Sequence, residues 1–152
     1  MVRTGLALAV ALAACGGGGS PKSEAAGPAF SPLIANALRA IADNCKLDRV
    51  GETERRDCSG RHGTVQISLT GNRLGELTIA LPSKILPEAK GHIGPGLQPV
   101  LGQAGIDQLF AKLEQLQTGQ RAELAIAGAQ ILIIAGGTSR IAPAYTVELR
   151  WR

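Results

Sequence analysis

Aromatic side chains are scarce in this chain of 152 residues, where they make up 3% of the sequence as Phe30, Phe110, Tyr145 and Trp151. Proteins that hold single-stranded nucleic acid or sugars stack them on aromatic faces, so this scarcity weighs against both functions. The core has to be built from Leu, Ile, Val and Ala instead, and an apolar content of 45% is sufficient for a globular protein.

The chain also lacks a large excess of positive or negative charge. The chain has 16 Lys and Arg against 12 Asp and Glu, a net charge of +4. That charge is too small and too mixed to form the electrostatic footprint of a nucleic-acid-binding protein. Long apolar runs are also missing, since none reaches the roughly 18 to 20 residues that cross a bilayer as a helix.

Residues that could carry catalysis or bind a metal are few. His62 and His92 are the only two histidines, and neither has another ligand three or four positions away, so we expect solvated surface side chains and no metal site. Cys58 lies close to His62, but haem attachment requires two cysteines before the histidine. A thiolate nucleophile would require Cys58 to be free. No catalytic residue is therefore assigned, and we expect no cofactor.

The N-terminus has the three parts of an export signal. Residues 1–3 are a short basic start, residues 6–12 are apolar, and the small residues Ala13 and Ala14 follow at once. A basic start, a short apolar stretch and a cleavage site with small residues are typical of secretory signal peptides.

The tetrapeptide Leu12-Ala13-Ala14-Cys15 resembles the lipobox of bacterial lipoproteins. The resemblance implies cleavage before Cys15, a signal peptide over 1–14, and covalent diacylglycerol and N-acyl lipid on Cys15. The residue after Cys15 is Gly16 in place of aspartate, which resembles the sorting signal for the outer membrane. In a Gram-negative cell this resemblance implies a location on the periplasmic face of the outer membrane. The alternative is an ordinary secretory signal that contains a cysteine.

A flexible tether is expected over 15–30, because this segment is rich in Gly and Ser and has no apolar periodicity. Such a segment reaches roughly 20 Å and would hold a domain over 31–152 just clear of lipid headgroups. More than one acyl chain is needed for stable anchoring.

The two remaining cysteines, Cys45 and Cys58, are an even pair in a compartment that favours oxidation. A disulfide between them would close a loop of about 14 residues and add on the order of 3 kcal/mol of stability. Two free buried thiols or a metal site are the alternatives.

The apolar pattern predicts an α+β domain. Ser31 resembles an N-cap before a helix over 32–43, and a second helix runs from Ile106 to Leu116. Alternation predicts strands at 64–70 and 77–81, 121–127, 130–135 and 144–151. The polar segment 45–62 and the Gly- and Pro-rich segment 82–104 show no regular period. We therefore expect a mainly antiparallel sheet of about five strands with two amphipathic helices, in the order αββαβββ.

The segment 84–105 is the candidate binding site. Irregular loops of this length are uncommon unless they bind something. The side chains available to seat in a partner are His92, Ile93, Leu97, Val100 and Leu101. The alternative is a crossover connection whose apolar side chains pack on the protein's own sheet.

These observations favour a lipid-anchored envelope lipoprotein whose domain is a non-catalytic binding module. Its expected partners are the membrane, reached through the lipid, and another envelope protein, with no nucleic acid. An anchored domain gains effective concentration toward partners on the same surface. The alternative function is an envelope hydrolase that uses the 84–105 loop as a lid.

Overall fold

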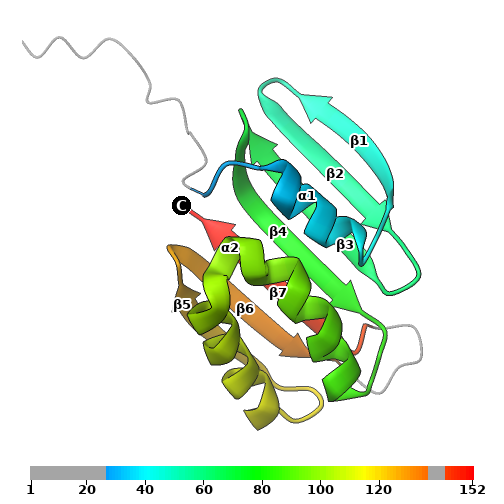
Figure 1. Ribbon diagram of the computed structural model, residues 1–152, viewed down its shortest axis with the longest axis vertical. Helices are drawn as coiled ribbons and strands as arrows, with labels where there is room; N and C mark the ends of the chain where they lie inside the picture. Colours follow the sequence, from blue (N-terminus) through cyan, green and yellow to red (C-terminus); the bar gives the residue numbers. More distant parts are fainter. Residues whose placement is uncertain (1–26, 137–142) are drawn as a thin grey trace, which may run out of the picture.

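A seven-stranded antiparallel sheet lies behind a layer of helices in the computed structural model (Figure 1), which describes residues 27–136 and 143–152. The predicted signal peptide over 1–14 and the predicted lipidation site Cys15 lie outside the described residues. The elements in chain order are α1 (Pro32–Arg39), β1 (Asn44–Val50), β2 (Thr53–Ser59), β3 (Thr64–Thr70), β4 (Arg73–Leu81), α2 (Leu86–Gln115), β5 (Arg121–Ile126), β6 (Ala129–Ala135) and β7 (Tyr145–Trp151).

The sheet order is β1-β2-β3-β4-β7-β6-β5, and every neighbouring pair is antiparallel. The first four strands form a meander, and β7 returns to lie between β4 and β6. The α+β class and the antiparallel sheet are confirmed. The expected count of about five strands is wrong, because two further strands precede β3.

Those two strands, β1 and β2, form a hairpin where the sequence predicted no regular element. All seven residues of β1 are exposed, and β2 buries only Glu54 and Cys58. An edge strand with little buried surface has no need of apolar alternation, so the period that identifies β3 and β4 is missing here.

Helix α1 begins as its sequence predicts. The Ser31 side chain accepts a hydrogen bond from the Ile34 N–H at 3.3 Å, which satisfies one of the free donors of the first turn. Ile34 and Leu38 point into the core, and the regular helix ends at Arg39. The chain stays packed beyond that end, because Ile41 is also buried.

The expected irregular segment 82–104 is wrong. The chain there forms the first half of α2, a helix that turns back on itself at Gly102, whose φ of 69° and ψ of 171° are not helical. The two halves lie side by side (Figure 1), with Lys90 paired to Glu114 and its ammonium group 5.2 Å from the Phe110 ring centroid. The element is therefore a helical hairpin, and its second half contains the predicted helix.

Burial explains why this helix forms despite its prolines and glycines. Seven buried residues recur at every fourth position: Ala89, Ile93, Leu97, Leu101, Gly105, Leu109 and Leu113. Within each half of the hairpin, that spacing places the buried residues along one side of the helix. Interior prolines each cost about 3 kcal/mol, and burial of large aliphatic side chains at about 1.5–3 kcal/mol each offsets this cost.

Residues 27–30 are more ordered than their composition predicts. The sequence predicts flexible tether here, yet Ala29 forms a bridge with Arg73 and the Leu74 N–H donates to the Pro28 carbonyl. Strand β4 extends past the end of β7, which leaves its backbone groups free to pair with this segment. No helix in the described ranges is long and apolar enough to cross a membrane.

Candidate functional site

The predicted binding loop is part of the core. Ile93 and Leu97 are 0% exposed and Leu101 is 6% exposed, so these side chains are not available to a partner. Val100 packs against the same core, and His92 lies on the helix surface. The segment that the alternative hydrolase would use as a lid is largely helical, and its apolar side chains are buried.

The topology instead leaves one face of the sheet uncovered. Both helices lie on the same side of it (Figure 1), where the buried residues of each strand point. The alternate residues form the opposite face, and the central part of that face is polar, with Gln66 and Ser68 of β3 and Thr78 of β4. A bare polar face of this kind is common in antiparallel sheets.

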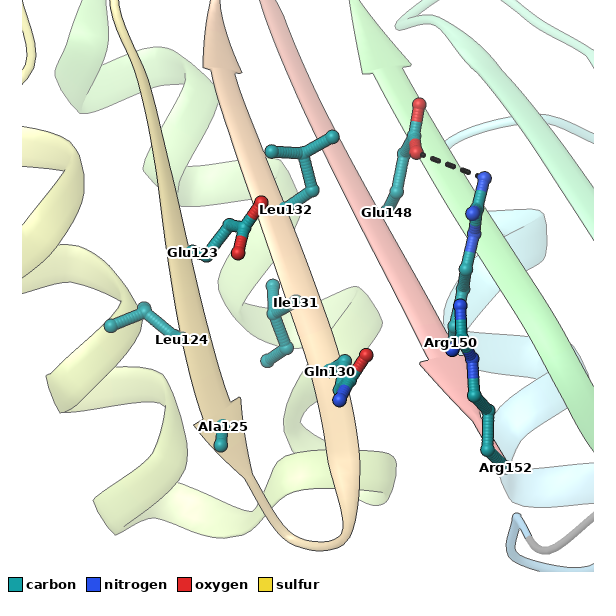
Figure 2. A pocket seen from close by; sticks show the side chains of 9 residues that line it. All are labelled: Glu123, Leu124, Ala125, Gln130, Ile131, Leu132, Glu148, Arg150 and Arg152. Atoms are coloured by element: carbon teal, nitrogen blue, oxygen red, sulfur yellow. Dashed lines mark ion pairs between the residues drawn. The ribbon is translucent and has the colours of Figure 1, made fainter.

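A hollow of about 500 Å³ opens on this face over β5, β6 and β7 (Figure 2). Its lining residues are Glu123, Leu124, Ala125, Gln130, Ile131, Leu132, Glu148, Arg150 and Arg152. Leu132 lies between Glu123 of β5 and Glu148 of β7, which are its partners in the ladder. The hollow thus combines a partly buried leucine with flanking charges of both signs.

Two arginines line one side of the hollow. Arg150 and Arg152 are two residues apart at the end of β7 (Figure 2). Arg150 lies 3.6 Å from both Glu76 and Glu148, whereas Arg152 makes no ion pair within the described ranges. A guanidinium binds carboxylates in bidentate geometry, so this side of the hollow suits an acidic group.

A second, smaller arrangement joins the two histidines, which the sequence treats as independent. His62, in the β2–β3 turn, stacks on His92 of α2 with ring centroids 4.2 Å apart and planes 26° from parallel. Both side chains are partly exposed, and the sequence gives no sign that the two rings meet. Thirty positions separate them, and only the packing of α2 against the sheet brings them together.

The hollow beside these rings measures about 230 Å³ and includes Ser83 and Glu88. The Ser83 hydroxyl donates to Glu88 Oε2 at 2.8 Å, and it also accepts the Ile85 N–H. Within the described ranges neither imidazole is hydrogen-bonded to that hydroxyl, so the contact between nucleophile and base that acyl transfer requires is not formed. Within the same ranges, no three His, Cys, Asp or Glu side chains are grouped to hold a metal ion.

The remaining predicted site is a disulfide, and the structure contains it. Cys45 and Cys58 are joined across β1 and β2, where they are directly opposite each other in the ladder. Neither thiol is therefore available as a nucleophile or a metal ligand. The bridge ties the outermost strand to one whose Cys58 is buried in the core.

Glu54 is the one buried charged residue of the described ranges. Its carboxylate accepts hydrogen bonds from Arg49, at 2.7 and 3.0 Å, and from Arg56 at 2.5 Å. These hydrogen bonds, with the attraction of both guanidinium groups, hold the pKa of the Glu54 carboxyl below its ordinary value, although burial acts in the opposite direction. Arg56 also lies 4.9 Å from the Phe30 ring centroid, so the cluster is structural.

The hollow over β5–β7 is the larger of the two surface arrangements, and it lies on the face that the helices leave free. Its lining combines charges of both signs with a partly buried leucine. Comparisons of the chain with protein-family models, with curated proteins and with solved structures find no match.

Proposed function

We propose that this chain is a lipid-anchored protein of the bacterial envelope whose domain binds a partner protein through the open face of its sheet. Cys15 carries the lipid in this proposal, the segment that follows it is the tether, and the partner lies in or near the same membrane. The domain recruits and performs no chemistry of its own. The outer membrane, on its periplasmic side, is the proposed location.

The observation that carries the binding role is the hollow of about 500 Å³ on the uncovered face. Ligand and partner sites combine apolar surface with a few polar groups that fix orientation. Leu132 supplies the apolar contact here, and Arg150, Arg152, Glu123 and Glu148 surround it.

The charges of the hollow indicate the chemistry of the partner. Arg152 makes no ion pair in the described ranges, and Arg150 is only loosely paired, at 3.6 Å from its two carboxylates. An acidic side chain of the partner fits beside these arginines, and an apolar side chain next to it fits on Leu132. Burial of arginine at an interface often makes a large contribution to affinity.

Photo-cross-linking in cells tests this surface with the full-length chain. A photoactivatable residue at Gln130, which is exposed in the hollow, should trap a partner in the membrane fraction. The same residue at Gln108, which is exposed on α2, is the matched control and should trap none.

Charge reversal gives the second part of this test. Arg150→Glu together with Arg152→Glu should abolish the adduct from Gln130, whereas Arg39→Glu, on the exposed surface of α1, should leave it unchanged. An adduct that forms equally from Gln108, or one that survives the double reversal, would overturn the assignment of the open face.

A further inference from the structure

Strand β1 is an open edge of the sheet. It pairs with β2 on one side, and no strand of the described chain pairs with its other side. All seven of its residues are exposed, including Leu47 at 55% and Val50 at 76%. A sheet edge of this kind presents a row of unpaired N–H and C=O groups to another strand.

The charges of β1 are arranged around its exposed leucine. Lys46 precedes Leu47 and Asp48 follows it, so both charged side chains lie on the open face of the sheet and Leu47 lies on the other face. Neither Lys46 nor Asp48 makes an ion pair within the described ranges, because Arg55 and Asp57 on the neighbouring strand pair with each other at 3.3 Å. Two copies of such a segment, with the order cation, leucine, anion, are complementary when they lie antiparallel, because the cation of each is then opposite the anion of the other.

The β1–β2 register fixes which backbone groups face outward. Cys45 and Cys58 are directly opposite with Cα atoms 4.0 Å apart, the narrow spacing of a pair that exchanges no backbone hydrogen bonds. The Gly60 N–H donates to the Gly63 carbonyl at 2.9 Å, so Gly60 and Gly63 are a hydrogen-bonded pair. Because bonded and non-bonded pairs alternate along a ladder, the backbone groups of Cys58 point toward β3. Cys45 and Cys58 are therefore a non-hydrogen-bonded pair by this route as well. The N–H and C=O groups of Cys45, Leu47 and Arg49 therefore point away from β2.

We propose that two copies of this chain pair edge to edge through β1, antiparallel, around a two-fold axis at Leu47. Leu47 of one copy is then opposite Leu47 of the other, and the outward N–H and C=O groups of these two residues bond to each other. Lys46 of each copy lies opposite Asp48 of the second copy, in the closer, non-hydrogen-bonded position where cross-strand side chains interact best. Two ion pairs and a leucine contact form at once.

The adjacent registers are disfavoured by charge. A two-fold axis at position 46 places Lys46 of one copy opposite Lys46 of the other. An axis at position 48 places the two Asp48 side chains opposite each other. Like charges directly opposite each other destabilise a strand pair. A single edge strand buries little surface, so the dimer is expected to be reversible and to depend on concentration.

Charge reversal with rescue tests the register. Two differently tagged full-length copies are co-expressed, co-purified in mild detergent, and measured by analytical ultracentrifugation. Either Lys46→Asp or Asp48→Lys, made alone, places like charges opposite each other at both of the two 46–48 contacts of the homodimer. The dissociation constant of the dimer should then rise about tenfold or more. Mixing these two variants sets unlike charges opposite each other at both positions, so the mixed dimer should return to wild-type affinity.

The double variant Lys46→Asp/Asp48→Lys should also restore the homodimer. Arg121→Glu, at an exposed position of the opposite edge strand β5, is the matched control and should leave the dissociation constant unchanged. A wild-type chain that sediments as a monomer at the highest concentration reached would overturn the proposal. A dimer whose dissociation constant is unchanged by both single charge reversals would also overturn it, as would a β1 edge occupied by a strand of another protein. The proposal does not depend on the lipid anchor or on the open-face hollow.

Discussion

Cys45 lies directly opposite Cys58, and the disulfide between them fastens a strand that buries none of its own residues. The replacement of both cysteines by alanine should lower the free energy of unfolding by up to about 3 kcal/mol, the value expected for a loop of this length. Urea unfolding measures this loss. Hydrogen exchange should become fast over 44–50 and stay slow in β3 and β4, because the core does not include β1.

Reduction of the wild-type protein should reproduce both changes, and the double variant should not respond to reductant. If thiol-specific alkylation labels Cys45 and Cys58 in unreduced, denatured protein, the bridge is not formed in the cell.

Glu54→Gln should remove part of the acid sensitivity of the fold. Because the carboxyl has a lower pKa when folded than when unfolded, the stability it contributes is fully present above the unfolded value of about 4.3. That contribution is lost as the pH falls through the folded pKa. The variant should lose about 1–3 kcal/mol at pH 7 and show a weaker decline of stability below pH 4. Thermal unfolding between pH 7 and pH 3 checks both effects.

Glu123→Gln, at an exposed position of β5, serves as the control and should follow the wild type across this range. An unchanged acid profile in the Glu54 variant would mean that the two arginines do not act on this carboxyl.

Cys15→Ser tests the lipid anchor independently of the fold. The resemblance to the lipobox places the acylated thiol at this residue, so the variant should lose all labelling by radioactive palmitate and should remain uncleaved before position 15. The Cys45 and Cys58 thiols are joined in a disulfide and offer no second site. Labelling that persists in the variant would contradict the lipoprotein interpretation.

Leu97→Ala distinguishes the core role of α2 from the loop that the sequence predicts. Leu97 is 0% exposed, and large-to-small replacements at such positions cost about 2–5 kcal/mol. A side chain on a mobile binding loop would cost little. Chemical denaturation measures the difference, and Leu33→Ala, at a position 67% exposed on α1, is the control that should change stability by much less.

The strands that sequence alone could predict are those with one buried face. In β3, Val65, Ile67 and Leu69 alternate with polar residues because one side packs under helices and the other meets water. Strand β1 faces water on both sides, so no such pattern marks it. Regular alternation reports burial, and a strand without burial does not show it.

The sequence does not predict the first half of α2, because it contains residues that usually break helices. Pro95 and Pro99 indicate an irregular segment, yet the apolar residues from Ala89 to Leu101 recur at the spacing of four that is typical of a helix face. A Cβ at Gly96 would lie 2.8 Å from Ile41 Cδ1, so the glycine there permits close approach of two elements.

The open-face hollow and the stacked histidines follow from tertiary arrangement alone. Glu123, Leu132 and Arg150 meet because β7 enters the sheet between β4 and β6. No local signal near any of these residues specifies that strand order. The predicted lipobox differs from them, because a motif made of adjacent residues can be proposed from the sequence without knowledge of the fold.

The turn at Gly102 yields a prediction that separates backbone strain from packing. Gly91 and Gly102 both belong to α2, and a Cβ at either position would meet no atom within 4 Å. Gly91 is helical, so Gly91→Ala should stabilise the protein by about 0.5–1 kcal/mol. Gly102 has a φ of 69° and a ψ of 171°, a region open almost only to glycine, so Gly102→Ala should cost about 1–3 kcal/mol. Urea unfolding of the two variants should show shifts of opposite sign. A Gly102→Ala protein as stable as the wild type would mean that α2 does not turn back at this residue, because a continuous helix accepts alanine at both positions.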